Sequence, residues 1–272
     1  MQSMLEMLRL PFMQRALLVG TLAALCAALL GVSLVLKRYS MIGDGLSHVG
    51  FGALAIAAVT GIAPLRLAIP VVLAAAFGLL VLTENSRVKG DSAIAMISAA
   101  ALSVGVMIVS LSGGGLDLSG YMFGSILALK SEDTLLSVLL CCAVLALYAL
   151  CYHQIFTVTF DEAFSAAIGV RTGAVKFLLA ALTAVTTVLG MRLMGTLLIS
   201  SLIVFPALSA MQLFRSFRGV TLCAACVSVL CFGSGMLLSC ALSTPAGASV
   251  VCVNAAVFVL AWLCGRLWRG GK

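Results

Sequence analysis

The residues best suited to chemistry are an aspartate and a histidine in the short motif GDGLSH, residues 43–48. Asp44 and His48 are four positions apart, so on a helix that has begun by Asp44 their side chains lie on one face. A carboxylate and a neutral imidazole are ligands that suit zinc, and they suit manganese or iron in a shell with more oxygen atoms. The next residues, VGFGALAIAAV, are apolar. An ionised carboxylate beside such a run has to face protein or water rather than lipid, which makes the motif a candidate metal site.

Two ligands from one chain are too few for tight metal binding. In a symmetric dimer the same motif supplies two carboxylates and two imidazoles, and the two carboxylate charges balance a divalent cation. The alternative is structural: Asp44 caps a helix that starts near MIGDG, and His48 is a satisfied core histidine. Ser47 is not a nucleophile activated by His48, because neighbouring helical positions point apart and no third member is evident. The residues alone leave the metal interpretation and the structural one open.

The motif lies in a chain with the composition of a membrane protein. Of its 272 residues, 63% are apolar and 9% are charged, and the mean hydropathy is +1.24. No strand alternation is evident, so we predict an all-α polytopic membrane protein rather than a barrel. Residues 1–272 form a single transmembrane domain in this prediction, and a glycine-rich stretch after Leu111 forms a loop with a short surface helix. The predicted spans, about nine, cover roughly residues 14–36, 45–63, 65–83, 92–111, 133–152, 173–190, 195–213, 219–242 and 247–265.

The net charge of +7 indicates topology rather than nucleic-acid binding, because the basic residues fall in ones and twos between apolar runs. Cytoplasmic loops are enriched in lysine and arginine, and a cytoplasmic C-terminus gives the better separation. An odd number of spans then places the N-terminus outside. The apolar run from Ala16 to Leu36 is too long for a signal peptide. The basic residues predicted to be cytoplasmic are Lys37, Arg38, Arg87, Lys89, Arg171, Lys176, Arg215, Arg218, Arg266, Arg269 and Lys272.

Several function classes lack their motifs. The sequence has no Walker A pattern, no HExxH zinc-protease motif and no GxSxG nucleophile elbow, so we predict no enzymatic activity in this chain. His153 is most simply an interfacial residue. The ten cysteines lie mostly in apolar runs, where a thiol packs as a small core residue, and we expect no disulfides. Few acidic residues lie within the predicted spans, which disfavours a proton-driven secondary transporter or channel.

Three further stretches carry polar or helix-breaking residues. In FTVTFDEAFSAAIGVRTG, residues 156–173, Thr159 and Glu162 fit a capping box and Gly169 a helix stop, which predicts a short helix in a cytoplasmic loop. An ordinary solvated connection is the alternative. In MRLMGTLLISSLIVFPALSA, residues 191–210, Pro206 is predicted to kink or end the span. In STPAGASV, residues 243–250, Pro245 and Gly247 predict an external turn.

Taken together and in this order, these stretches resemble the permeases of ATP-binding-cassette importers for zinc and manganese, the ABC-3 family. The segments that carry the resemblance are GDGLSHVGFGALA, DLSGYMFGSILAL, FTVTFDEAFSAAIGV, GTLLISSLIVFPALSA and TPAGASVV. The resemblance implies a fold like that of vitamin and siderophore importers, and it favours the metal role for Asp44 and His48. It also implies that residues 156–173 form the element that couples to a cytoplasmic ATPase, with Glu162, Ala163 and Gly169 as the coupling residues.

The same resemblance implies the partners and the cargo. The partners are a dimeric cytoplasmic ATPase, a periplasmic or extracellular metal-binding protein and a second permease copy, all at a bacterial inner membrane. No cofactor is held permanently; the cargo is Zn²⁺, with Mn²⁺ or Fe²⁺ next, because the TPAG form leans towards the zinc relatives. Many relatives carry an acid just before TPAG, where this chain has Ser243, so the outer gate is expected to use Asp117, Ser243 or both.

Overall fold

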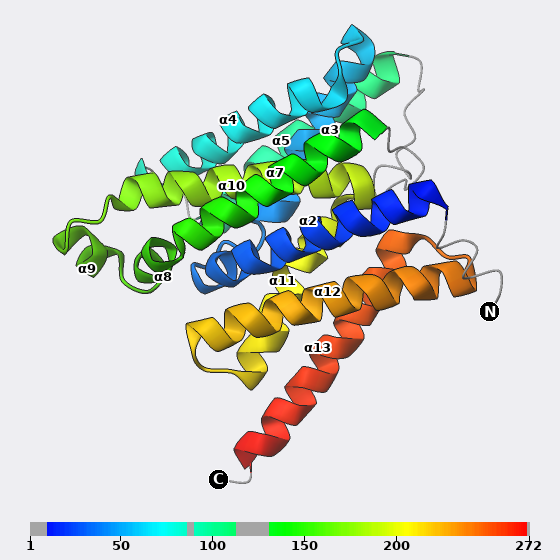
Figure 1. Ribbon diagram of the computed structural model, residues 1–272. Coiled ribbons are helices and arrows are strands. Elements are labelled where there is room, and N and C mark those ends of the chain that lie inside the picture. The colour runs from blue at the N-terminus through cyan, green and yellow to red at the C-terminus, as the bar shows by residue number, and fades with distance from the viewer. Residues whose placement is uncertain (1–9, 86–89, 113–130, 271–272) are drawn as a thin grey trace.

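The computed structural model describes residues 10–85, 90–112 and 131–270, and every regular element in these ranges is a helix. Figure 1 shows the helices packed side by side as one elongated bundle, with the short α8 and α9 at one end. The helices are α2 (Pro11–Leu36), α3 (Ile42–Thr60), α4 (Pro64–Asn85), α5 (Gly90–Leu111), α7 (Ser131–Leu150), α8 (Tyr152–Phe160), α9 (Glu162–Ala167), α10 (Thr172–Met194), α11 (Thr196–Leu213), α12 (Phe217–Leu242) and α13 (Ala246–Gly270).

The predicted spans agree with these helices. Within the described ranges, eight helices are long and apolar enough to cross a membrane, and a ninth span is obtained if α7 and α8 count as one bent unit. These two helices meet at Cys151 with a bend of 66°. The sequence predicts one span over residues 133–152 there and no helix immediately beyond it. The predicted loop and surface helix after Leu111 fall mostly on residues 113–130, outside the described residues.

The core of the bundle is built around α2. This helix contacts α7, α10, α11 and α12, and it buries small residues such as Ala23, Ala24 and Ala27, which allow close helix approach. At Gly31 the approach is closest. A Cβ added to Gly31 would lie 2.0 Å from the backbone oxygen of Ile203 on α11. Only glycine therefore permits this crossing of α2 and α11.

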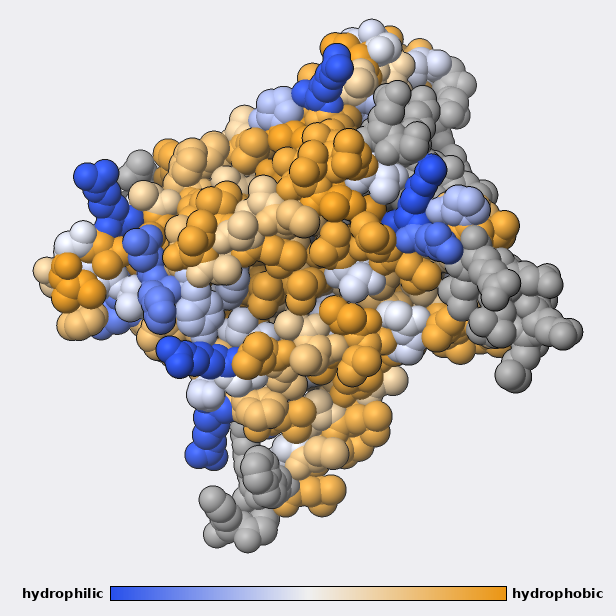
Figure 2. All heavy atoms as spheres, in the orientation of Figure 1, coloured by the Kyte–Doolittle hydropathy of each residue, from blue (hydrophilic) through white to orange (hydrophobic). Residues whose placement is uncertain are grey.

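The surface has the polarity pattern of a membrane protein. Figure 2 shows a broad apolar area over the middle of the visible face, with hydrophilic side chains gathered towards the ends of the bundle. Large apolar side chains such as Leu139, Leu230 and Val104 are exposed on the long helices. Because a hydrocarbon core requires an apolar outer surface, these exposed residues fit lipid contact.

A tight turn leads from α2 into the helix that carries the candidate site. The amide of Tyr39 donates to the Leu34 carbonyl at 2.8 Å, the amide of Arg38 donates to the Val35 carbonyl at 3.1 Å, and Arg38 has φ 62°. This is the Schellman pattern, with arginine in the left-handed position where glycine is usual. The turn ends α2 and starts α3 within five residues, so Lys37 and the beginning of α3 stay close together.

The helix end considered for Pro206 is not found. Pro206 lies inside α11, which continues without interruption to Leu213, so Pro206 does not end the span. The break in this part of the chain lies earlier, at Gly195, which has φ 83° and separates α10 from α11. A glycine with positive φ and extended ψ leaves the helical conformation altogether, whereas a proline inside a helix leaves only one backbone bond unmade.

Candidate metal site and coupling segment

The start of α3 places Asp44 and His48 on the same helix face. The helix begins at Ile42, and Met41 is its N-cap residue, with no side-chain cap hydrogen bond. Asp44 therefore lies within the first turn and does not cap the helix. The interpretation of Asp44 as a helix cap is wrong, because the helix starts earlier than that interpretation requires.

The two side chains face each other across a short gap. Oδ2 of Asp44 lies 3.6 Å from Nε2 of His48, and the two side chains are 37% and 23% exposed, respectively. This separation is longer than a good hydrogen bond. Two ligand atoms on one tetrahedral zinc ion lie about 3.4 Å apart, given metal–ligand distances near 2.05 Å. The gap is therefore close to the one that a shared cation needs.

Two serine hydroxyls bond to Asp44, one to its carboxylate and one to its backbone carbonyl. The side chain of Ser200, on α11, donates to Oδ1 of Asp44 at 3.3 Å, and it also lies 3.0 Å from the Thr196 carbonyl. Ser47 is fully buried, and its hydroxyl donates to the backbone carbonyl of Asp44 at 2.7 Å. Asp44 is thus held from two elements, by its own helix and by α11.

The described residues supply only part of a metal shell. No three histidine, cysteine, aspartate or glutamate side chains gather closely enough in the described ranges to hold a metal ion. Nδ1 of His48 is buried and has no hydrogen-bond partner among the described residues. Buried polar atoms are normally hydrogen-bonded, so this nitrogen is the place in the site where a water molecule would complete the hydrogen bonding of the imidazole.

The second candidate region is the short helix α9, and its ends are built differently from the prediction. The N-cap residue is Asp161, whose Oδ1 accepts from the Phe164 amide at 2.9 Å. The predicted capping box from Thr159 is wrong, because Thr159 belongs to α8 and its hydroxyl donates to the Ile155 carbonyl instead.

Gly169 stops α9 as predicted. It has φ 88°, its amide donates to the Ala166 carbonyl at 3.1 Å, and the amide of Val170 donates to the Ser165 carbonyl at 3.0 Å. These two bonds form a Schellman motif, in which a glycine adopts the left-handed conformation at low cost. Residues 161–170 are therefore a compact unit closed at both ends.

Glu162 connects this unit to two long helices. Its Oε1 pairs with the ammonium group of Lys176 on α10, and its Oε2 lies 3.8 Å from Nζ of Lys37 at the end of α2. The hydrogen bond from Lys176 lowers the pKa of Glu162, and the charge of Lys37 adds to the effect, so the carboxylate is ionised at neutral pH. One carboxylate thus joins α9 to both α2 and α10.

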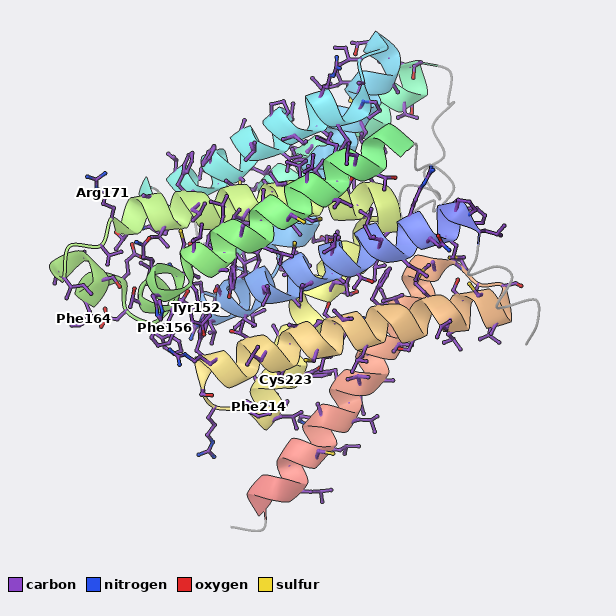
Figure 3. All side chains as sticks on the ribbon, viewed as in Figure 1. Tyr152, Phe156, Phe164, Arg171, Phe214 and Cys223 are labelled. Atoms are coloured by element: carbon purple, nitrogen blue, oxygen red, sulfur yellow. The ribbon has the colours of Figure 1, made fainter. Side chains whose placement is uncertain are left out.

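The outer side of the α8–α9 region exposes large apolar side chains. Phe160, Phe164 and Ile168 are each more than half exposed, and Ala163 is exposed beside them. Figure 3 shows Phe164 on α9 and Arg171 in the turn after it, both at the end of the bundle and pointing away from its interior. Apolar side chains gathered on a short helix outside the long spans are typical of a protein contact.

An aromatic group attaches α8 to α12. The ring of Phe217, at the start of α12, lies 5.5 Å from Tyr152, 5.1 Å from Phe156 and 5.9 Å from Phe160, measured between centroids. Figure 3 shows Tyr152 and Phe156 on α8, close to the start of α12. The α8–α9 region therefore contacts α12 through rings and α2 and α10 through charges.

Of the two residues expected at an outer gate, the structure describes only Ser243. Asp117 lies outside the described residues. Ser243 is the left-handed C-cap residue of α12, with φ 52°, in the turn to α13 at the end of the bundle opposite α9 (Figure 1). Hydroxyl groups near it bond one another, since Thr244 Oγ1 and Ser249 Oγ are 2.7 Å apart. A gating role for Ser243 and Asp117 stays a prediction.

Two of the three contact residues, Ser200 and Lys37, have no local pattern in the sequence that indicates their contacts. Ser200 is separated from Asp44 by 156 residues, and Lys176 follows Glu162 by 14. The sequence predicts only that Lys37 and Lys176 are cytoplasmic. A basic residue in the first turns of the helix after a short acidic helix is the one local pattern that points to Lys176. Nothing local points to Ser200, because its position depends on how α11 packs against α3.

Comparison with known proteins assigns the chain to a protein family. Residues 9–265 match the family described as the ABC 3 transport family. This chain belongs to the ABC 3 transport family. It is a multi-pass membrane protein and a transport subunit rather than an enzyme, as predicted. An ABC permease operates with an ATPase and a substrate-binding protein.

Relatives in this family cover nearly the whole chain. The chain is 30% identical over 260 residues to an uncharacterized membrane protein from the ycf23-apcF intergenic region of Cyanophora paradoxa, covering 94% of this chain and 86% of the relative. It is 30% identical to the high-affinity zinc uptake system membrane protein ZnuB of Haemophilus influenzae, covering 90% and 94%. It is 26% identical to the manganese transport system membrane protein MntC of Listeria monocytogenes, covering 93% and 90%.

Solved structures support the predicted fold. The chain is similar to PsaBC from Streptococcus pneumoniae in complex with Fab, with a TM-score of 0.85 and 25% identity over 96% of this chain and 95% of that one. A second structure, an inward-facing conformation of a putative metal-chelate type ABC transporter, has a TM-score of 0.70 and 16% identity, covering 92% and 85%. The predicted all-α permease architecture is confirmed.

Proposed function

We propose that this ABC 3 family permease moves a divalent transition metal into the cytoplasm past Asp44 and His48, with zinc as the first cargo and manganese or iron next. The observation that carries the proposal is the 3.6 Å gap between a carboxylate oxygen and an imidazole nitrogen inside a multi-pass bundle. The names of the relatives support the cargo class, since ZnuB is named for zinc and MntC for manganese. Identity is somewhat higher to the zinc relative.

The proposal extends to a second permease copy at a bacterial inner membrane. One described chain offers one carboxylate and one imidazole, whereas a symmetric pair offers two of each and balances the charge of a divalent cation. Energy comes from a separate ATPase. The exposed apolar side chains of α9 would rest on this ATPase, and Glu162 would pass the movement of α9 to α2 and α10. On the opposite face, a metal-binding protein delivers the ion near the α12–α13 turn.

The test is uptake of ⁶⁵Zn²⁺ and ⁵⁴Mn²⁺ by proteoliposomes that contain the permease, its ATPase and the binding protein. Asp44→Asn and His48→Ala are expected to lower uptake below about one tenth of wild type, because each removes a metal ligand. Both variants should still assemble with the ATPase. Asp91→Asn, at the exposed start of α5, and His153→Ala, on α8, are the matched controls and should retain uptake.

Two results would contradict the proposal. Normal uptake by Asp44→Asn and His48→Ala would remove these residues from the path. Metal flux through liposomes that contain this chain alone, without ATPase or ATP, would instead indicate a gradient-driven transporter or channel. Comparing both metals in the same vesicles identifies the preferred cargo directly.

A further inference from the structure

We infer that the hydroxyl of Ser200 is a third ligand for the cation held by Asp44 and His48, and that it sets the preference between manganese and zinc. The inference rests on the proposed function. It assigns a chemical role to a residue on α11, a helix distant in sequence from the motif that carries the other two ligands.

The first argument is the position of the hydroxyl. Ser200 Oγ lies 3.3 Å from Oδ1 of Asp44, while the other carboxylate oxygen, Oδ2, faces His48 Nε2 at 3.6 Å. The carboxylate therefore links the two groups, with the hydroxyl at one of its oxygens and the imidazole at the other. Ser200 is half-buried, like Asp44 and His48, so it shares their access to the path.

The second argument is hydrogen-bond capacity. A serine hydroxyl has one hydrogen and two lone pairs. Two acceptors compete for that single hydrogen, the Thr196 carbonyl at 3.0 Å and Asp44 Oδ1 at 3.3 Å. When the hydrogen goes to Thr196, the Ser200 oxygen turns lone pairs towards the carboxylate, and a cation between the two oxygens replaces their repulsion with attraction. The hydroxyl can thus serve as a donor to the empty site and as a ligand to the occupied one.

The third argument is rigidity. Ser200 lies on α11, and the side chains next to it on this helix, Leu198, Ile199 and Leu202, are almost fully buried. Packing therefore fixes the position of Oγ, in contrast to a hydroxyl on a surface loop. Ligands on rigid elements hold a defined geometry and so discriminate between ions.

The fourth argument concerns ligand chemistry. Imidazole suits zinc, while carboxylate and other oxygen ligands suit manganese. With Ser200 included, one chain supplies two oxygen-bearing groups and one nitrogen. Removing the hydroxyl shifts this balance away from manganese, and replacing it with a thiol gives a soft ligand that favours zinc. The hydroxyl therefore allows the site to bind manganese as well as zinc.

The experiment measures the ratio of ⁵⁴Mn²⁺ to ⁶⁵Zn²⁺ uptake in proteoliposomes with the complete transporter. Binding of Mn²⁺ to the purified transporter is measured in parallel by its electron paramagnetic resonance signal, with Zn²⁺ as competitor. Ser200→Ala is expected to lower the ratio of manganese to zinc about tenfold, because the cation loses an oxygen ligand that suits manganese. Ser200→Cys should lower it further, and Ser200→Thr, which keeps the hydroxyl, should restore it.

The matched control is Ser201→Ala. Ser201 is the next residue, is buried, and donates its hydroxyl to the Leu198 carbonyl at 2.9 Å, away from Asp44. An unchanged ratio in both Ser200→Ala and Ser200→Cys overturns the inference, as does an equal loss in Ser201→Ala. If Ser200→Ala fails to assemble, the Thr and Cys variants decide, and equal ratios for these two overturn it. Normal uptake by Asp44→Asn would instead mark failure of the proposed function.

Discussion

The candidate metal site and residues 161–170, the proposed coupling segment, hold their charged groups in opposite ways. Asp44 and His48 are held by a long helix inside the bundle, where α3 packs against α5 and α11 through buried apolar side chains such as Leu46 and Ile94. Glu162 belongs to a helix of six residues at the end of the bundle, held by a cap, a Schellman turn and two lysines. The first region is positioned by packing and the second by polar contacts.

This difference has a mechanical meaning. Close packing allows few alternative arrangements, so a substitution that disturbs the packing around the candidate metal site is expected to disrupt its geometry rather than shift it slightly. Exposed polar contacts contribute little energy each, so the coupling segment can shift and reform its contacts at low cost. A segment that transmits movement benefits from the second property, and a site that selects an ion benefits from the first. Substitutions in the two regions are therefore expected to differ in size.

The largest effect is expected where packing is tightest. Gly31→Ala places a Cβ 2.0 Å from the Ile203 backbone oxygen, which cannot move without shifting α11. We expect a loss of about 3 kcal/mol of folding free energy and displacement of Ser200 from Asp44. Thermal unfolding of the purified protein in detergent measures it. Gly233→Ala in α12, where nothing lies within 4 Å, is the control and should gain up to about 1 kcal/mol. Equal behaviour of the two variants would show that the α2–α11 crossing is not tight.

A smaller effect is expected at Glu162. Glu162→Gln keeps the shape and removes the charge, so the contacts to Lys37 and Lys176 weaken, and uptake per ATP hydrolysed is expected to fall about twofold to fivefold, the range of an exposed ion pair. The measurement is metal uptake and ATP hydrolysis in the same vesicles. Raised salt should reduce the difference between the variant and wild type, because it screens these charges. Unchanged coupling at low salt would remove Glu162 from the coupling element.

The same carboxylate predicts a pH dependence. Its folded-state pKa lies below the ordinary value of 4.5, so its contribution to the stability of the segment is fully present above pH 4.5 and is lost as pH falls through the lower folded-state pKa. Hydrogen exchange of residues 161–170, corrected for its intrinsic pH dependence, should show faster opening in that acidic range. Glu162→Gln should open at a rate that does not change across it.

The smallest effect is expected at the cap of α9. Asp161→Ala removes the acceptor for the Phe164 amide and should cost about 1 kcal/mol, confined to the six residues of the helix. Hydrogen exchange of residues 162–167 measures it. Asp161→Asn retains a capping oxygen and should behave like wild type. A change in the thermal unfolding of the whole protein by Asp161→Ala would contradict the separation of the two regions.

The sequence predicts the fold well because each membrane span requires a long apolar run, which can be recognised without tertiary structure. It also predicts the Asp44–His48 face, since a spacing of four residues on a helix needs no knowledge of tertiary structure. Gly169 is predicted as a helix stop for a similar reason, because its conformational preference is local.

The failures have a common cause. Thr159 is a plausible cap only if no helix precedes it, and α8 does precede it. The 66° bend at Cys151, where α8 starts, has no proline or glycine beside it that would predict a bend. Ser200 comes to Asp44 through the crossing of α3 and α11, and Lys37 comes to Glu162 through the turn at Arg38. Each of these depends on three-dimensional packing between segments distant in sequence, for which a single sequence carries no direct signal.

The ring contacts of Phe217 affect how easily α8 can move relative to α12. A tilted or edge-on aromatic pair keeps much of its attraction over a range of offsets, whereas an ion pair weakens as its partners separate. In the proposed coupling, a push on α9 would reach α2 and α10 through Glu162 and its two lysines, while the ring contacts of α8 with Phe217 would tolerate a small displacement. Because α2 leads through its tight turn into α3, such a push would arrive at the start of the helix that carries Asp44.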